Sequence, residues 1–173
     1  EPHWIDGNLY SNRTSIGQAF RRVSRYCGFD EIEAGKTMGL SAYGSGDINL
    51  FNEEYGHSLC STQLRPEGNT TAYVGPKLPR EDLAYNLQKS AEKHTLFMIR
   101  KAVELTNKKN VCLSGGFFLN CVSNYSILKN TDVNLYVDPI AYDGGLAIGS
   151  ALLEYYEHFC DKPRPIRLST VLA

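Results

Sequence analysis

Two short apolar segments, each followed by a Gly-Gly pair and a helix-forming segment, lie in the C-terminal half of this 173-residue chain. The segment at 111–113 leads into glycines at 115–116, and the segment at 133–138 leads into glycines at 144–145. Short strand-like runs that alternate with helical segments are typical of α/β proteins with parallel strands. We therefore predict an α/β fold in which the two strands lie parallel and each is followed by a helix.

The segment before the first strand carries the pattern of a long amphipathic helix. Pro79 and two acidic residues begin it, and apolar residues at helical spacing continue for about seven turns to a basic pair at 108–109. Proline suits a first turn, where acidic side chains also oppose the helix dipole. A shorter helix is predicted at 15–28, ended by Gly28.

The segment at 44–80 is rich in Asn, Gly, Pro and Ser, which favours turns and loops. We predict an irregular insertion there, with one hairpin formed by 58–64 and 71–74. A short helical piece is expected just before it, and no element is expected in the tail at 163–173. The chain begins without Met, and we interpret residues 1–173 as one partial domain of a larger protein.

Composition restricts the class of protein. No stretch approaches the roughly 18 apolar residues that a membrane span needs, so no membrane association is predicted. The formal net charge of -1 offers no basic surplus, which argues against nucleic-acid binding through the phosphate backbone. Five widely spaced cysteines without a Cys-x-x-Cys pair, and no signal segment, indicate the reducing cytoplasm.

The carboxyl ends of the two predicted strands form the candidate ligand site, because parallel sheets bind ligands there beside exposed helix N–H groups. Gly115 and Gly116 have no Cβ, so a phosphate, ribose or adenine can approach their backbone. Asn120, expected one turn into the following helix, would direct an amide to the same edge. The alternative is a tight turn that needs glycine, followed by a surface asparagine.

Asp143 follows the second strand. A carboxylate beside a nucleotide can hold a divalent metal, Mg²⁺ or Mn²⁺ with oxygen ligands alone and Fe or Zn with added histidines. Asp143 can equally cap a helix, a contribution of about 1 kcal/mol. The four histidines form no closely spaced pair that would complete a metal site. Gly35, beside Lys36, allows a further close approach to a phosphate or belongs to a solvated turn.

Three segments together resemble, in order and at compatible spacing, the motifs of NodU/CmcH-type carbamoyltransferases. They are EAGKTMGLSAYG (33–44), VCLSGGFFLNCVSN (111–124) and DPIAYDGGLAIGSAL (138–152). The helix at 15–29 is also similar to that family. The resemblance implies an ASKHA fold, built from two RNase H-like halves with parallel strands flanked by helices, of which this chain would be the C-terminal half.

In that family one domain makes carbamoyl-adenylate from ATP and carbamoyl phosphate. The ASKHA domain then passes the carbamoyl group to a hydroxyl of a small metabolite at an iron-type centre. The resemblance implies that Gly115 and Gly116 approach the adenylate phosphate and ribose, that Asn120 contacts the nucleoside and that Gly35 packs against the adenosine. Asp143 would be the carboxylate ligand of the metal and would act in catalysis through it.

The chain also departs from the family pattern. An H-x-x-x-H stretch, an early Asp-Gly-Gly loop and the adenylate-forming domain are absent, and Arg21 stands where the tRNA-modifying branch has a ribose-binding Asp. We therefore expect the remainder of the parent enzyme as a partner and an isolated chain that is inactive. Two alternatives stay open: a tRNA threonylcarbamoyl transferase-like protein and a non-catalytic nucleotide-binding module.

Overall fold

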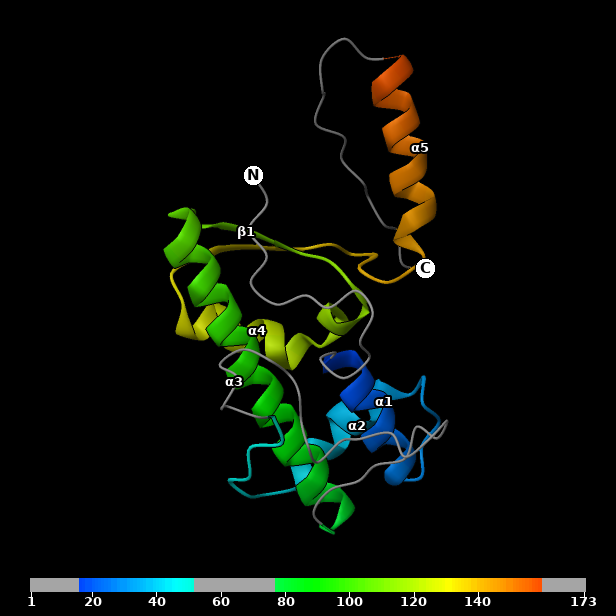
Figure 1. Ribbon diagram of the computed structural model, residues 1–173. Coiled ribbons are helices and arrows are strands. Elements are labelled where there is room, and N and C mark those ends of the chain that lie inside the picture. Colours follow the sequence, from blue (N-terminus) through cyan, green and yellow to red (C-terminus); the bar gives the residue numbers. More distant parts are fainter. Residues whose placement is uncertain (1–15, 52–76, 160–173) are drawn as a thin grey trace.

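The computed structural model describes residues 16–51 and 77–159, which build an α/β arrangement around a two-stranded parallel sheet (Figure 1). The predicted hairpin and the tail at 163–173 lie outside these residues. From α3 onward the predicted order helix–strand–helix–strand–helix is confirmed. The elements are α1 (Ile16–Tyr26), α2 (Ala34–Leu40), the 3-10 helix η1 (Ser41–Tyr43), α3 (Arg80–Thr106), β1 (Asn110–Leu113), the 3-10 helix η2 (Gly116–Leu119), α4 (Cys121–Asn130), β2 (Asn134–Val137) and α5 (Gly145–His158).

The long helix α3 supports the rest of the described fold. Pro79 precedes it and its carbonyl accepts a hydrogen bond from Leu83 N at 2.9 Å, while Asn107 ends it in a left-handed conformation. Ala84 and Leu87 in its first half are fully buried, as the predicted apolar stripe requires, but Leu105 at the end of that stripe is 47% exposed. The helix therefore packs along its N-terminal and central turns and projects at its C-terminal end.

A first hydrophobic cluster joins α1 and α3. Phe20 and Val23 of α1 pack with Leu83 and Leu87 of α3, and the predicted apolar stripe of the first helix is confirmed. One part of the α1 pattern is wrong, because Arg22, expected on the solvent side with its neighbouring arginines, is only 5% exposed. It follows Ala19 by three residues, so it lies at the edge of the buried stripe.

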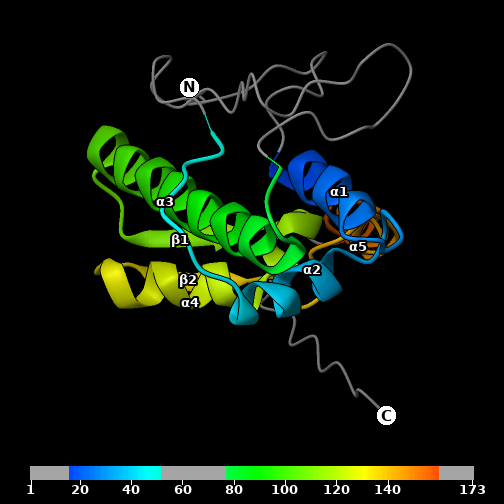
Figure 2. The same ribbon diagram turned by 90° about the horizontal axis from the view of Figure 1, so that it is seen from below.

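A second cluster lies under the sheet. The strands pair in parallel, with Leu113 opposite Val137, and both side chains point to the face covered by α3 and α4. Ile99 of α3 and Ile127 of α4 complete that cluster, and Figure 2 shows both helices running alongside the strands. Alternate strand residues face the other way, and among them Tyr136 is 53% exposed. In the described part of the chain, one face of the sheet is covered and the other is open.

The last helix, α5, stands apart from the body of the fold (Figure 1). None of its described residues is buried, and Leu146 and Leu153 are 72% and 61% exposed. Among the described helices, none combines the length and apolar character needed to cross a bilayer.

Candidate functional site

The loops after β1 and β2 meet at the carboxyl edge of the sheet. Because the strands are parallel, both loops leave at the same edge. Asp138 N donates to Leu113 O at 3.2 Å, and beyond it Gly115 N donates to Ala141 O at 2.7 Å. These two bonds continue the contact between the chains past the strands, so the two Gly-Gly turns are held beside one another.

Open space lies in front of the first turn. Gly115 has a φ of 108° and a ψ of 147°, a conformation that other residues rarely adopt. A Cβ added at Gly115 would have no neighbour within 4 Å, and one at Gly116 would meet only Tyr142 Cβ, at 4.0 Å. Both glycines are exposed. The backbone of this turn is therefore accessible to a ligand, although Gly115 is also required by its own conformation.

The second turn needs its glycines for a different reason. A Cβ at Gly145 would lie 2.5 Å from Ile140 O, and one at Gly144 would lie 2.6 Å from the Tyr142 ring. The contact with the Ile140 carbonyl excludes a side chain at Gly145, whereas the ring near Gly144 belongs to Tyr142, which is 54% exposed and can move. These glycines let the chain turn tightly from β2 into α5, and they leave Asp143 exposed at the edge of the sheet.

Asp143 does not cap the helix that follows it. Gly144 precedes α5 and no side chain caps this helix, while the backbone carbonyl of Asp143 accepts from Leu146 N at 3.1 Å. The alternative of an N-cap is therefore wrong. By contrast, Asp138 Oδ1 accepts from Ile140 N at 2.7 Å and shapes the loop. The Asp143 carboxylate has no hydrogen-bond partner among the described residues.

Asn120 lies elsewhere than expected. We placed it one turn into the helix, but residues 116–119 form the 3-10 turn η2, so α4 begins only at Cys121. Asn120 is the N-cap of α4, and its Oδ1 accepts from Ser123 N at 3.0 Å. The alternative of a surface asparagine is also wrong, because Asn120 is 9% exposed.

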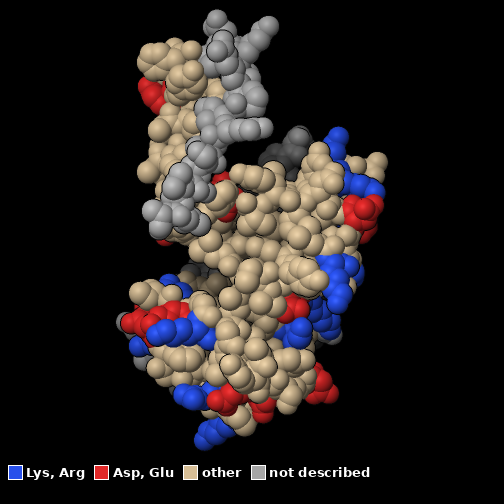
Figure 3. Space-filling model, turned by 180° about the vertical axis from the view of Figure 1, so that it is seen from behind, with Lys and Arg blue, Asp and Glu red and all other residues tan. Residues whose placement is uncertain are grey.

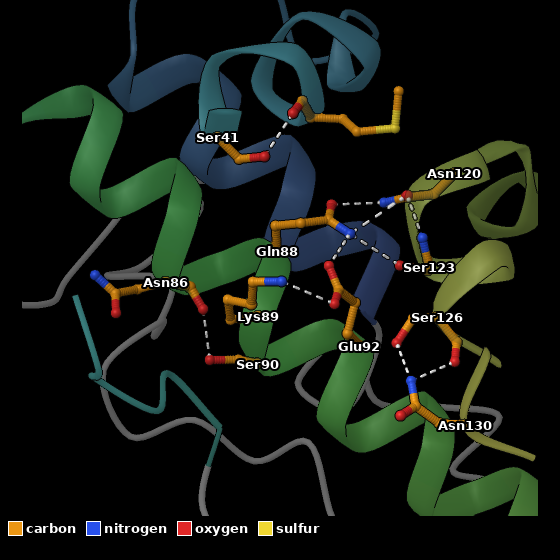
Figure 4. A network of polar contacts seen from close by, with 11 residues as sticks. Ser41, Asn86, Gln88, Lys89, Ser90, Glu92, Asn120, Ser123, Ser126 and Asn130 are labelled. Atoms are coloured by element: carbon orange, nitrogen blue, oxygen red, sulfur yellow. Dashed lines mark hydrogen bonds and ion pairs between the residues drawn. The ribbon is translucent and has the colours of Figure 1, made fainter. Parts of the chain in front are cut away.

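A buried polar network surrounds Asn120 (Figure 4). Asn120 Nδ2 donates to Gln88 Oε1 at 2.9 Å, which joins the start of α4 to α3. Gln88 Nε2 in turn lies 3.1 Å from Glu92 Oε1 and 3.1 Å from Ser123 Oγ. The sequence offered one signal for this network, the i, i+4 spacing of Gln88 and Glu92 on one helix face, but such pairs are common on exposed helices.

Gly35 is the second residue of α2 and is exposed, and a Cβ there would meet nothing within 4 Å. Beside it, Lys36 Nζ donates to Glu33 Oε1 at 2.5 Å, and this bond lowers the pKa of the Glu33 carboxyl. Helix α2 packs against α1, α3 and η1. Helix α1 in turn approaches the first Gly-Gly turn, since the rings of Phe20 and Phe117 lie 6.1 Å apart.

The structure also places Arg21 and three of the cysteines discussed in the sequence. Arg21 is half exposed and forms an ion pair with Glu31 at 3.2 Å. Cys27 is a buried free thiol, and Cys112 and Cys121 are exposed free thiols. Within the described ranges, no three His, Cys, Asp or Glu side chains gather closely enough to hold a metal ion.

Known proteins resemble the chain over most of its length. Residues 3–152 match the model of a family described as carbamoyltransferase N-terminus. The chain is 28% identical over 171 residues to the nodulation protein NolNO of Sinorhizobium fredii, which covers 87% of the chain and 24% of that protein. It is 29% identical over 168 residues to the nodulation protein NolO of Bradyrhizobium diazoefficiens, which covers 83% of the chain and 29% of that protein.

An uncharacterized protein of Synechocystis is 30% identical over 191 residues, which covers 91% of the chain and 29% of that protein. The chain thus spans between about a quarter and three tenths of the length of these relatives.

Proposed function

The chain belongs to the carbamoyltransferase N-terminal family, and on that premise we propose that it forms part of an enzyme that carbamoylates a hydroxyl of a small metabolite. The carbamoyl donor is carbamoyl-adenylate, which a further domain of the parent enzyme makes from ATP and carbamoyl phosphate. The described residues belong to the domain that carries out the transfer.

The carboxyl edge of the sheet is the observation that carries this proposal. The hydrogen bond from Gly115 N to Ala141 O at 2.7 Å sets an accessible glycine backbone beside the loop that holds Asp143. Backbone without side chains suits a phosphate and ribose, which must approach closely. We assign Gly115 and Gly116 to the adenylate, Asn120 to the nucleoside and Gly35 to the adenosine.

The transfer replaces one bond to the carbamoyl carbon by another. The acceptor hydroxyl oxygen attacks that carbon, the bond from the carbon to the adenylate phosphate oxygen breaks, and AMP leaves with the electron pair. The hydroxyl proton passes to solvent or to a base. N–H groups of the Gly115–Gly116 turn would stabilise the charge that gathers on the leaving phosphate.

The described residues do not by themselves fit a metal centre. Asp143 offers an exposed carboxylate with no hydrogen-bond partner in the described ranges, but it belongs to no group of three possible ligands there. We propose Asp143 as one ligand of an iron-type ion whose remaining ligands come from another part of the parent enzyme. Such an ion would polarise a carbonyl.

We also propose that the chain is the C-terminal half of an ASKHA-type transfer domain. The open face of the sheet supports this, because parallel strands are ordinarily covered on both faces. The exposed apolar residues of α5, Leu146 and Leu153 among them, support it as well. An isolated chain would then lack the surfaces and ligands that its reaction needs.

The test is the fate of ATP in the full-length protein. With carbamoyl phosphate and an acceptor hydroxyl present, the proposal requires pyrophosphate to form in the first step and AMP in the second. ADP as the product, or no turnover, would contradict it. Binding of ATP without turnover would instead favour a non-catalytic nucleotide-binding module.

A tRNA-modifying activity within the same fold remains the alternative reaction. On the face in Figure 3, Lys and Arg are interspersed with Asp and Glu rather than gathered into a broad basic surface. This supports a small-molecule acceptor over a polyanion. A gel shift of tRNA by the full-length protein at physiological salt would overturn that preference.

A further inference from the structure

Asn120 has a restricted hydrogen-bonding capacity. Its Oδ1 accepts from Ser123 N at 3.0 Å and also lies 3.4 Å from Gln88 Nε2, whose two hydrogens are shared with the closer Glu92 Oε1 and Ser123 Oγ. Its Nδ2 donates to Gln88 Oε1, which uses one of two hydrogens. The second hydrogen has no partner among the described residues. The bond that Asn120 is best placed to offer a ligand is therefore a donated one, through that hydrogen.

The orientation of this amide is imposed from α3. Glu92, as a carboxylate, only accepts hydrogen bonds, so the Gln88 group 3.1 Å from Glu92 Oε1 must be the NH₂. Gln88 Oε1 therefore faces Asn120. Because this oxygen only accepts hydrogen bonds, the Asn120 group that faces it must be the NH₂. The carboxylate itself is fixed by Lys89, whose Nζ lies 3.1 Å from Glu92 Oε2.

We propose that Gln88 is a positioning residue, which together with Glu92 fixes the Asn120 amide as a hydrogen-bond donor to an acceptor atom of the bound nucleotide. The proposal rests on the nucleoside role assigned to Asn120 above and adds the direction of the bond and the residues that enforce it. Burial supports the rigidity of this arrangement, since Gln88 is 2% and Ser123 0% exposed.

AMP binding to the full-length protein, followed by calorimetry, tests the donor. Asn120→Asp keeps a good helix cap but removes the NH₂, so AMP affinity should fall by about tenfold or more, as loss of one hydrogen bond with a repulsive contact produces. Unchanged affinity in Asn120→Asp and Asn120→Ala would remove the nucleoside role and with it this inference.

The positioning role of Gln88 is tested by first removing and then restoring the hydrogen-bond acceptor that faces the Asn120 amide. Gln88→Leu should weaken AMP binding by about tenfold, because the Asn120 NH₂ loses the acceptor that orients it. The double exchange Gln88→Glu with Glu92→Gln should restore affinity to within about threefold, since a carboxylate at 88 again faces Asn120 only as an acceptor. A merely structural role predicts no such recovery of affinity.

Asn86 provides the matched control. It is a 2%-exposed amide on the same helix, and its Oδ1 accepts from Ile48 N at 2.8 Å. Figure 4 shows Asn86 and Asn120 on opposite sides of Gln88. Asn86→Leu should lower the melting temperature and leave AMP affinity unchanged. The positioning role is overturned if Asn120→Asp loses AMP binding while Gln88→Leu retains it. It is also overturned if the double exchange binds AMP as weakly as Gln88→Leu.

Discussion

Gly115 N donates a hydrogen bond to Ala141 O at 2.7 Å, and this one contact joins the two glycine turns that follow the parallel strands. Gly115 makes this contact with a φ of 108°, whereas Gly116 beside it does not have a positive φ. Glycine at 115 is therefore needed for the backbone conformation, whereas glycine at 116 leaves space in front of the backbone.

Alanine at each position tests this separation. Gly115→Ala should lower the free energy of unfolding by about 1–3 kcal/mol, the cost of holding a residue with a Cβ in that conformation. Gly116→Ala should change stability by less than about 0.5 kcal/mol, because its Cβ meets nothing closer than 4.0 Å, yet it should weaken AMP binding. Urea-induced unfolding and calorimetry measure the two effects. Equal AMP affinity in Gly116→Ala and the unaltered protein would contradict the assignment of this turn to the nucleotide.

Asp143→Ala should abolish iron retention by the full-length protein and leave its circular dichroism unchanged, since the exposed carboxylate has no hydrogen-bond partner among the described residues. Asp132→Ala is the matched control: Asp132 is an exposed carboxylate that pairs with Lys109 before the strands begin. Its iron content should equal that of the unaltered protein. Normal iron in Asp143→Ala, measured by elemental analysis, would refute the ligand role.

Helix α2, which holds Gly35, is fixed to α1 by a buried pair of hydroxyls. Ser24 Oγ donates its hydrogen to Phe20 O at 2.8 Å, so in the 2.6 Å contact with Thr37 Oγ1 it must be the acceptor. Thr37→Val should cost about 1 kcal/mol of unfolding free energy, because Ser24 loses its donor without a change in shape.

Thr37→Ser keeps the hydroxyl and controls for this effect. It should retain the hydrogen bond and lose only the packing of a methyl group. Equal unfolding free energies for Thr37→Val and the unaltered protein would show that this bond does not fix α2.

The thiol of Cys27 predicts a loss of stability in alkali. It is 1% exposed and donates to Arg80 O at 3.7 Å, and burial raises its pKa from 9.0 to about 11. Because the thiol is neutral in the folded protein up to a higher pH than in the unfolded chain, its contribution to the free energy of unfolding is fully present below pH 9. That contribution is lost as the pH rises toward 11. The loss is on the order of 2 kcal/mol.

Unfolding midpoints between pH 8 and 11 should therefore fall more steeply in the unaltered protein than in Cys27→Ala. The two proteins share every other ionisable group, so the difference between the two profiles isolates the thiol. Parallel profiles would contradict a buried, neutral Cys27.

The sequence predicted those parts of the fold that follow from periodicity. The apolar stripe that begins with Ala84 and Leu87 located α3, and two short apolar runs located the strands, whose parallel pairing follows from the helix between them. Local turn chemistry was harder to predict: the 3-10 turn at 116–119 moved Asn120 from the helix interior to its cap. Tertiary contacts could not be predicted from the sequence, since nothing in the spacing of Gln88 indicates that it contacts Asn120, 32 positions away.

The same limit applies to the site. That two glycine turns share an edge follows from parallel strands, but the different reasons for glycine at 115 and at 145 depend on φ and on the position of Ile140 O. Likewise, whether Asp143 caps α5 depends on the conformation of residue 144, which residue type alone does not fix.

The most direct test separates formation of carbamoyl-adenylate from its use. In a single turnover of full-length protein with ATP, carbamoyl phosphate and an acceptor, pyrophosphate reports the first step and AMP the second. If this chain supplies the transfer site, Asp143→Ala should release pyrophosphate at the normal rate while AMP formation falls at least about a hundredfold, the loss that removing a key catalytic group commonly causes. AMP that keeps pace with pyrophosphate in Asp143→Ala would contradict the account.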